Sequence, residues 1–172
     1  MLIAAQILGV TAVGLFLLSY QLKRRSQIVW VSFFSNLFYV IQYVLLGAFS
    51  GVVMDLLCTA ASFLATKKYQ PFVKKHTKWF VAATVLVIMA IGIAITISSH
   101  SLMELLPAFG AAFQSAGLWC DNEQTIRKLG LCGAPCWLVY NIVAQAYGAA
   151  IGSLFIIISI IVSLVRYGKK KA

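Results

Sequence analysis

Charged residues are scarce in this sequence of 172 residues: they make up 10% of it, and only four are acidic. Hydrophobic residues make up 62%, and the mean hydropathy is +0.93. A soluble domain of this size cannot have so little polar surface, because its exterior must face water. The shortage of charge therefore excludes a soluble globular protein and predicts an integral membrane protein.

Residues that bind metals or act as nucleophiles are also few. The two histidines, His76 and His100, fall in predicted loops on opposite sides of the membrane. No C-x-x-C pair and no neighbouring histidine completes a zinc set around the four cysteines. These cysteines are Cys58, Cys120, Cys132 and Cys136. The sequence also lacks a nucleophile–base pair and a glycine-rich phosphate loop, so we expect no metal, no cofactor and no enzymatic activity.

Long apolar runs are what the sequence does have, and unbroken runs indicate helices rather than the alternating strands of a barrel. About 20 helical residues cross the 30 Å of hydrocarbon in a bilayer. Seven runs are long enough, and they leave only short loops. The predicted spans are 2–20, 28–47, 50–66, 79–97, 102–119, 130–148 and 150–166.

The basic residues are placed unevenly along these spans. All 14 lysines and arginines fall within 23–25, 67–78, 127–128 and 166–171, which are alternate connections and the C-terminal end. Because lysine and arginine loops stay in the cytoplasm, the N-terminus is predicted outside and the C-terminus inside. This placement predicts contact between the cytoplasmic rim and anionic lipid head groups, and it argues against a nucleic-acid partner.

The two ends of the chain also resemble each other at an offset of 101 residues. Gly9 then matches Gly110, and six positions match within one stretch of about sixteen: Leu37, Tyr39, Ile41, Gly47, Ala48 and Gly51. Parallel repeats separated by one linker helix are a known transporter plan, with the site between the halves. The sequence thus predicts a 3+1+3 arrangement: a first triple-helix bundle at 1–68, a linker region at 69–101 and a second bundle at 102–172. Chance matches among apolar helices are the alternative.

Two stretches, "MELLPAFGAAFQSAGLWC" and "APCWLVYNIVAQAYGAAIGSLF", resemble the YgjV-type bacterial inner membrane proteins. The layout and "WLVYNIVAQAYGA" are also similar to the SWEET and PQ-loop transporter superfamily. That resemblance implies an inner-membrane protein with a solute route between two triple-helix bundles. The superfamily's Pro-Gln pair appears here as Tyr20-Gln21 and Asp121-Asn122. Its sugar-contacting asparagines would fall near Cys58 and Ser159, so a sugar is not predicted.

Two predicted helices each carry a stripe of aromatic and amide side chains. On residues 133–148 the stripe covers an arc of about 140° at 100° per residue. An amide without partners in lipid costs about 1–3 kcal/mol, so both stripes must face protein or water. Interhelical packing is one explanation, and a solute-binding cavity is the other. The predicted substrate-binding residues are Asn36, Tyr39, Tyr43, Trp137, Tyr140, Asn141 and Gln145.

Four further residues are candidates for driving transport. Asp55 and Glu104 are acids in or near the membrane, where such groups are commonly functional, and we predict them as proton-coupling candidates. Stabilisation by a helix N-terminus is the alternative. Pro107 and Pro135 can kink the fifth and sixth spans and are hinge candidates, or else static kinks.

Together these patterns predict a small polar-solute transporter or facilitator of the bacterial inner membrane. The alternative is a non-transporting membrane receptor or interaction partner on the same fold. The sequence does not fix the solute, and it leaves open whether the protein forms a homo-oligomer.

Overall fold

The computed structural model describes residues 2–143 and 147–168, and this part of the chain is helical without any strand. Its elements are α1 (Leu2–Gln21), α2 (Arg25–Leu46), α3 (Phe49–Thr66), α4 (Pro71–Lys75), α5 (Thr77–Ser99), η1 (Leu102–Glu104), α6 (Leu105–Leu118), α7 (Glu123–Val143) and α8 (Tyr147–Gly168). Seven of them are long, and each overlaps one predicted span.

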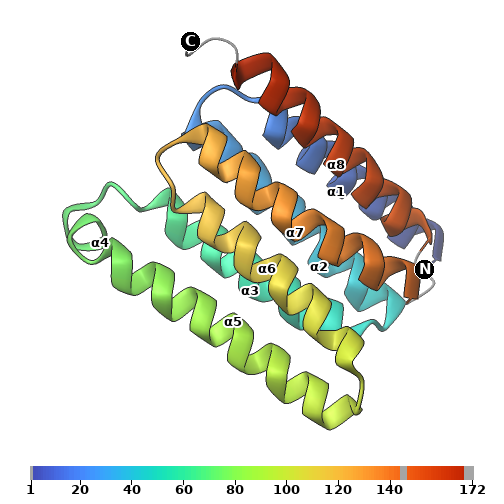
Figure 1. The fold of residues 1–172 in the computed structure, drawn as a ribbon. Helices are drawn as coiled ribbons and strands as arrows, with labels where there is room; N and C mark the ends of the chain where they lie inside the picture. The colour runs from blue at the N-terminus through green and yellow to red at the C-terminus, as the bar shows by residue number, and fades with distance from the viewer. Residues whose placement is uncertain (1, 144–146, 169–172) are drawn as a thin grey trace.

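The long helices form two layers of three, with α5 at one edge (Figure 1). One layer holds α1, α2 and α3, and the other holds α6, α7 and α8, in each case with the middle helix packed on both neighbours. Between the layers, α1 packs against α8 and α3 packs against α6. The middle helices, α2 and α7, therefore face each other across the centre of the bundle.

Local signals explain several of the helix ends. Gly47 has φ +70°, and the amides of Gly47 and Ala48 close the last turn of α2 on Val44 and Tyr43. Glycine adopts this left-handed conformation without strain. At the start of α7, the side chain of Asn122 accepts a hydrogen bond from the Gln124 amide at 2.9 Å. This bond satisfies one of the free amides in the first turn.

Small side chains bring the helices close together in the core. Met54, Cys58 and Ile88 pack with alanines of α6 where α3, α5 and α6 meet. Phe16 and Ile160 pack in a second cluster, where α1, α7 and α8 meet. The outer surface is apolar as well. In α5, only 11% of the most apolar stretch of 18 residues is buried inside the bundle. An apolar exterior of this kind suits a hydrocarbon environment.

The sixth predicted span, 130–148, differs from the helix at both ends, because α7 covers Glu123–Val143 and α8 begins at Tyr147. Hydropathy excluded Arg127 and Lys128 from the span, yet both lie in the helix and Arg127 is buried. Hydrogen bonds to backbone carbonyls make this burial possible. Gly148 belongs to α8 and not to the stripe on α7, and Gln145 lies outside the described residues.

Four segments of the described chain are long and apolar enough to cross a membrane: Arg25–Leu46, Phe49–Thr66, Thr77–Ser99 and Ala149–Tyr167. The segment Ile7–Gln21 is apolar but shorter. Helix α6 has 14 residues, which is about 21 Å at 1.5 Å per residue. It is thus shorter than the hydrocarbon core, and η1 precedes it directly.

The described lysines and arginines all lie where the chain turns at one end of the bundle, which we call the basic end. They belong to the α1–α2 connection, the segment from α3 to α5, the first turns of α7 and the last turn of α8. The connections α2–α3 and α5–α6 turn at the opposite end and carry none. The charge pattern of the sequence therefore corresponds to one face of the folded molecule.

Candidate functional site

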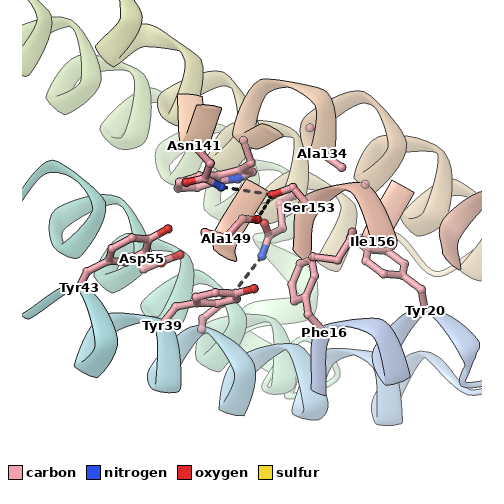
Figure 2. Close-up of a pocket in the computed structure, with 15 residues that line it drawn as sticks. Phe16, Tyr20, Tyr39, Tyr43, Asp55, Ala134, Asn141, Ala149, Ser153 and Ile156 are labelled. Atoms are coloured by element: carbon pink, nitrogen blue, oxygen red, sulfur yellow. Dashed lines mark hydrogen bonds between the residues drawn. The ribbon is translucent and has the colours of Figure 1, made fainter. Parts of the chain in front are cut away.

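A cavity lies between the two layers, where α2 faces α7 (Figure 2). Six of the eight α-helices, all except α4 and α5, contribute to its wall. A water molecule's centre can occupy about 40 Å³ of it, which is room for about three waters at 10–15 Å³ each. This conformation therefore admits only a small group. The lining residues predicted from the sequence are Asn36, Tyr39, Tyr43, Asp55, Trp137 and Asn141.

The aromatic part of the wall rests on helix spacing and on glycines. Tyr39 and Tyr43 are one turn apart on α2, and their rings stack at 6.2 Å between centroids. The Tyr43 ring lies on Gly51 of α3, where a methyl group would come within 3.1 Å of the ring. Trp137 lies in the same way on Gly110 of α6, at 2.7 Å from such a methyl. Glycine thus makes room for an aromatic ring in each layer.

Each layer also contains one asparagine–serine pair. Asn36 donates to the Ser62 hydroxyl at 3.1 Å, and Asn141 donates to the Ser153 hydroxyl at 3.2 Å. Each serine donates its own proton to the carbonyl four residues earlier in its helix. Because that proton is used, the serine hydroxyl can only accept a hydrogen bond from the asparagine. The amide nitrogen of each asparagine, and not its oxygen, must therefore face the serine.

The two amides differ at their oxygen ends. The Oδ1 of Asn36 accepts a hydrogen bond from the Gln114 side chain at 3.1 Å, a contact that joins the two layers. The Oδ1 of Asn141 is buried and has no partner within the described chain. A buried acceptor without a donor is costly. Asn141 lines the cavity, so an acceptor without a donor among the described residues lies at the cavity wall.

Asp55 is the one carboxylic acid among the described residues of the cavity wall, and it is 5% exposed. It lies six residues into α3, about 9 Å from the end of the helix that is remote from the basic end. No hydrogen bond or ion pair to its carboxylate occurs among the described residues, where the one ion pair joins Lys68 and Asp121. Its assignment to proton coupling remains a prediction.

Several other predicted residues lie away from the cavity. The Tyr140 hydroxyl is 2.8 Å from that of Ser50, linking α7 to α3 across the layers. Glu104 ends η1 instead of opening the fifth helix, and one of its buried oxygens has no partner in the described chain. Pro107 is in the first turn of α6, a position where a proline without its amide breaks no helical hydrogen bond, and its role as a hinge remains a prediction. Pro135 is inside α7, and its role as a hinge remains a prediction.

Sequence reasoning missed part of the wall, namely Phe16, Tyr20, Gln114, Ser153 and Ile156. Phe16 and Tyr20 are one turn apart on α1, and their rings meet edge to face at 5.3 Å. That spacing could have identified them, because it matches the spacing of Tyr39 and Tyr43. Gln114 was detectable as the one amide in the fifth predicted span.

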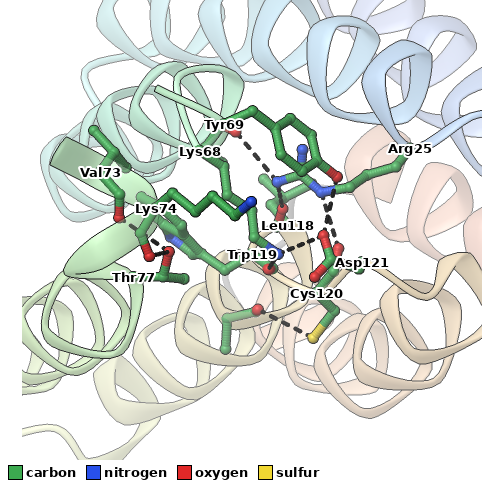
Figure 3. A network of polar contacts seen from close by, with 12 residues as sticks. Arg25, Lys68, Tyr69, Val73, Lys74, Thr77, Leu118, Trp119, Cys120 and Asp121 are labelled. Atoms are coloured by element: carbon green, nitrogen blue, oxygen red, sulfur yellow. Dashed lines mark hydrogen bonds and ion pairs between the residues drawn. The ribbon is translucent and has the colours of Figure 1, made fainter. Parts of the chain in front are cut away.

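A network of cations closes the basic end. Arg25, at the start of α2, donates to the carbonyls of Leu118 and Cys120 around the end of α6, and to Ala65 near the end of α3. Lys68 donates to the Trp119 carbonyl and forms the ion pair with Asp121 at 2.7 Å (Figure 3). Cations are favourable at helix C-termini, where free carbonyls carry partial negative charge.

Asp121 also accepts a hydrogen bond from the Tyr69 hydroxyl at 2.9 Å. The hydrogen bond from Lys68 holds the pKa of the Asp121 carboxyl below its usual value. The Arg25 guanidinium lies 5.4 Å from the Tyr69 ring centroid. The segment after α3 is thereby attached to the opposite layer.

Arg127 makes the corresponding contacts from α7 to α1. It is 2% exposed and donates to the carbonyls of Tyr20 at 3.2 Å and Leu22 at 2.7 Å. Its guanidinium lies 4.7 Å from the ring centroid of Tyr167. Arg25 is the first residue of α2, and Arg127 is near the start of α7. Each arginine thus lies in the middle helix of one layer and donates to carbonyls at a helix end of the other layer.

A family model described as Imp-YgjV, bacterial inner membrane protein, matches residues 3–171. Comparison with curated proteins and with solved structures gives no match.

Proposed function

Because the chain belongs to the Imp-YgjV family of bacterial inner membrane proteins, we propose that it carries a small polar solute across that membrane through the cavity between its layers. The observation that carries this proposal is the composition of the cavity wall. Polar and aromatic side chains from both layers meet there, although the exterior is apolar. A protein that only needed to pack its helices could use small apolar residues at these positions.

The proposal includes seven transmembrane helices in a 3+1+3 parallel repeat, with the N-terminus outside. Confinement of the described cations to one end supports this orientation. Two features support the repeat. The contacts between layers are reciprocal, α1 with α8 and α3 with α6. Each layer also has an asparagine–serine pair between its second and third helices. Helix α5 is then the linker that lets both triplets insert in the same orientation.

Access to the cavity would alternate between the two ends. At the basic end, Arg25, Lys68 and Arg127 all hold the layers together. Near the opposite end, the described residues have one hydrogen bond across the layers, between Ser50 and Tyr140. In this proposal, the conformation described here is the one closed to the cytoplasm, and the solute would enter from outside. Release inside requires the basic-end contacts to break.

Access of water to the cavity tests this function directly. In a cysteine-free background, Ala134→Cys places a thiol in the cavity wall, and Ala111→Cys places one in the packed core. A cysteine thiolate attacks the thiosulfonate sulfur of a methanethiosulfonate reagent and releases methanesulfinate, and the thiolate forms only where water reaches. For a carrier, methyl methanethiosulfonate should modify position 134 in native membranes and leave position 111 unmodified. Equal protection of both cysteines would mean a dry interior and would favour the receptor or scaffold alternative.

Growth of a deletion strain across nutrients and toxic analogues would identify a solute for uptake assays. We then expect Asn36→Leu and Asn141→Leu to reduce uptake at unchanged abundance in the membrane. Leu37→Ala and Leu138→Ala, each next to or near these positions, are the matched controls. Loss of abundance without loss of specific uptake would show that the amides only pack helices.

A further inference from the structure

We infer that the solute bound in this cavity is a small organic ammonium ion, recognised by the Asp55 carboxylate, the Asn141 Oδ1 and the rings of Tyr39 and Tyr43. This inference rests on the proposed function and adds the chemical class of the solute. It follows from the charge of the wall, the direction of its hydrogen bonds and the placement of its aromatic rings.

Among the described residues that line the cavity, Asp55 is the only carboxylic acid, and none is a lysine, arginine or histidine. Within that part of the chain, no cation lies beside its carboxyl group. The described cations lie at the basic end, where α3 finishes at Thr66, eleven residues beyond Asp55. That separation is about 16 Å along the helix. A carboxylate shielded from water needs a cation or a hydrogen-bond donor as its partner. Because the described residues supply no cation, we expect that partner to be a ligand that enters the cavity.

The hydrogen-bonding groups of the wall point to a donor as the missing partner. The side-chain amides of Asn36, Gln114 and Asn141 each already donate to a protein acceptor. Among the fully buried side-chain atoms of the described wall, the one without a partner is an acceptor, the Asn141 Oδ1. The Asp55 carboxylate has no ion-pair partner among the described residues either. An ammonium group with N–H bonds satisfies both acceptors. An anion would meet only lone pairs at these two positions.

The aromatic rings favour an organic cation over a metal ion. Gly51, on which the Tyr43 ring rests, is one turn before Asp55 on the same face of α3. Tyr39 stacks beside Tyr43, and Figure 2 shows both rings next to the carboxylate. Ring faces attract cations within about 6 Å and also pack against methylene groups. A metal ion would instead require several oxygen ligands in a shell, and the described residues contain no cluster of three or more metal-binding side chains.

The experiment measures protection of Ala134→Cys by added ligands. Position 134 is seven residues from Asn141 on α7, about 10 Å nearer the basic end. A ligand at Asp55 and Asn141 therefore blocks a reagent that enters from the opposite end. The probe is n-propylammonium chloride at constant ionic strength, and the controls are 1-propanol, propionate and sodium chloride. At ten times its Kd the ammonium should slow modification about 11-fold, because occupied sites are protected.

Substitutions separate the contribution of each group. Asp55→Asn should abolish protection and Asp55→Glu should retain part of it, whereas Glu104→Gln, an acid outside the cavity, should change nothing. Asn141→Leu should weaken protection by n-propylammonium but not by tetramethylammonium, which has no N–H to donate. The ligand comparison in protein carrying native Asp55 remains informative even if an Asp55 variant does not fold.

Three results would overturn the inference: equal protection by 1-propanol, protection by propionate, or protection by sodium chloride alone. Full protection of the Asp55→Asn protein would do the same. Each of these results leaves the proposed carrier function standing if position 134 is accessible. Failure of the reagent to reach position 134 at all would instead refute the carrier function itself.

Discussion

Replacing Arg127 with methionine tests whether buried cations hold the basic end together. Methionine keeps much of the length of the side chain but has no donor and no charge. The carbonyl of Leu22 then loses its one side-chain donor in the described structure, whereas that of Tyr20 keeps a hydrogen bond of 2.7 Å from Ser163. The Tyr167 ring also loses the nearer of two guanidinium groups, because that of Arg166 remains at 5.6 Å from its centroid.

The magnitude follows from these contacts. A hydrogen bond from a charged donor is worth about 1.5–3 kcal/mol, and a cation over an aromatic ring adds about 0.5–2 kcal/mol. Removing the charge also relieves its desolvation, which offsets part of the loss. We expect Arg127→Met to lower the free energy of unfolding by about 2–4 kcal/mol. Arg127→Lys should lie in between, because a single ammonium cannot replace a fork that reaches two carbonyls.

The assay is equilibrium unfolding of the purified protein in detergent micelles, followed by its tryptophan fluorescence. The matched control is Lys128→Ala, which removes an exposed cation one residue away and should change stability by less than about 0.5 kcal/mol. Equal stability of Arg127→Met and Lys128→Ala would refute the reasoning. The hydrogen bonds of Arg127 would then contribute nothing beyond those of an exposed neighbour.

Three further predictions concern orientation, packing and pH. In a cysteine-free background, Ser99→Cys should react with an impermeant reagent added outside intact cells and Thr77→Cys should not; the opposite pattern would reverse the orientation. Gly92→Ala places a methyl against the Ala108 Cβ, too close for two carbon atoms, and should destabilise the protein by about 1–3 kcal/mol, whereas Gly14→Ala, with no atom within 4 Å, should not; similar unfolding curves would disprove the close contact. Because the folded pKa of Asp121 is lowered, its stabilisation is present above the usual value of 3.8 and is lost as pH falls through the folded pKa. Since Asp121 is exposed, Asp121→Asn should remove only about 0.2–1 kcal/mol, and an unchanged acid limb of the stability profile would contradict this.

Much of the helical framework was predictable because apolar runs and basic loops are properties of the sequence alone. The errors occurred where a tertiary contact outweighs hydropathy. Arg127 counted against a membrane helix, but folding supplies carbonyl acceptors that no local window contains. The internal repeat could have indicated that Arg127 belongs to a helix as Arg25 does, because the two are 102 residues apart, one more than the offset of the other matches.

The candidate site was predictable to the extent that it depends on helix faces. The spacing of Asn36, Tyr39 and Tyr43 placed them on one side of α2, and all three line the cavity. Tyr140 shares the face of Trp137 and Asn141, yet its hydroxyl is next to Ser50 of the other layer. Which of two neighbouring residues lines a cavity depends on the facing helix, and the sequence does not specify that helix.

The carbonyls at the end of α1 have a consequence for biosynthesis. Those of Tyr20, Gln21 and Leu22 accept hydrogen bonds from Ser163, Tyr167 and Arg127, which the ribosome adds more than 100 residues later. During synthesis, the polar end of α1 therefore lacks these hydrogen bonds until α7 and α8 have been made. A nascent chain released early would expose that end to membrane proteases. Two separately translated halves could still complete each other if both were inserted in the same membrane.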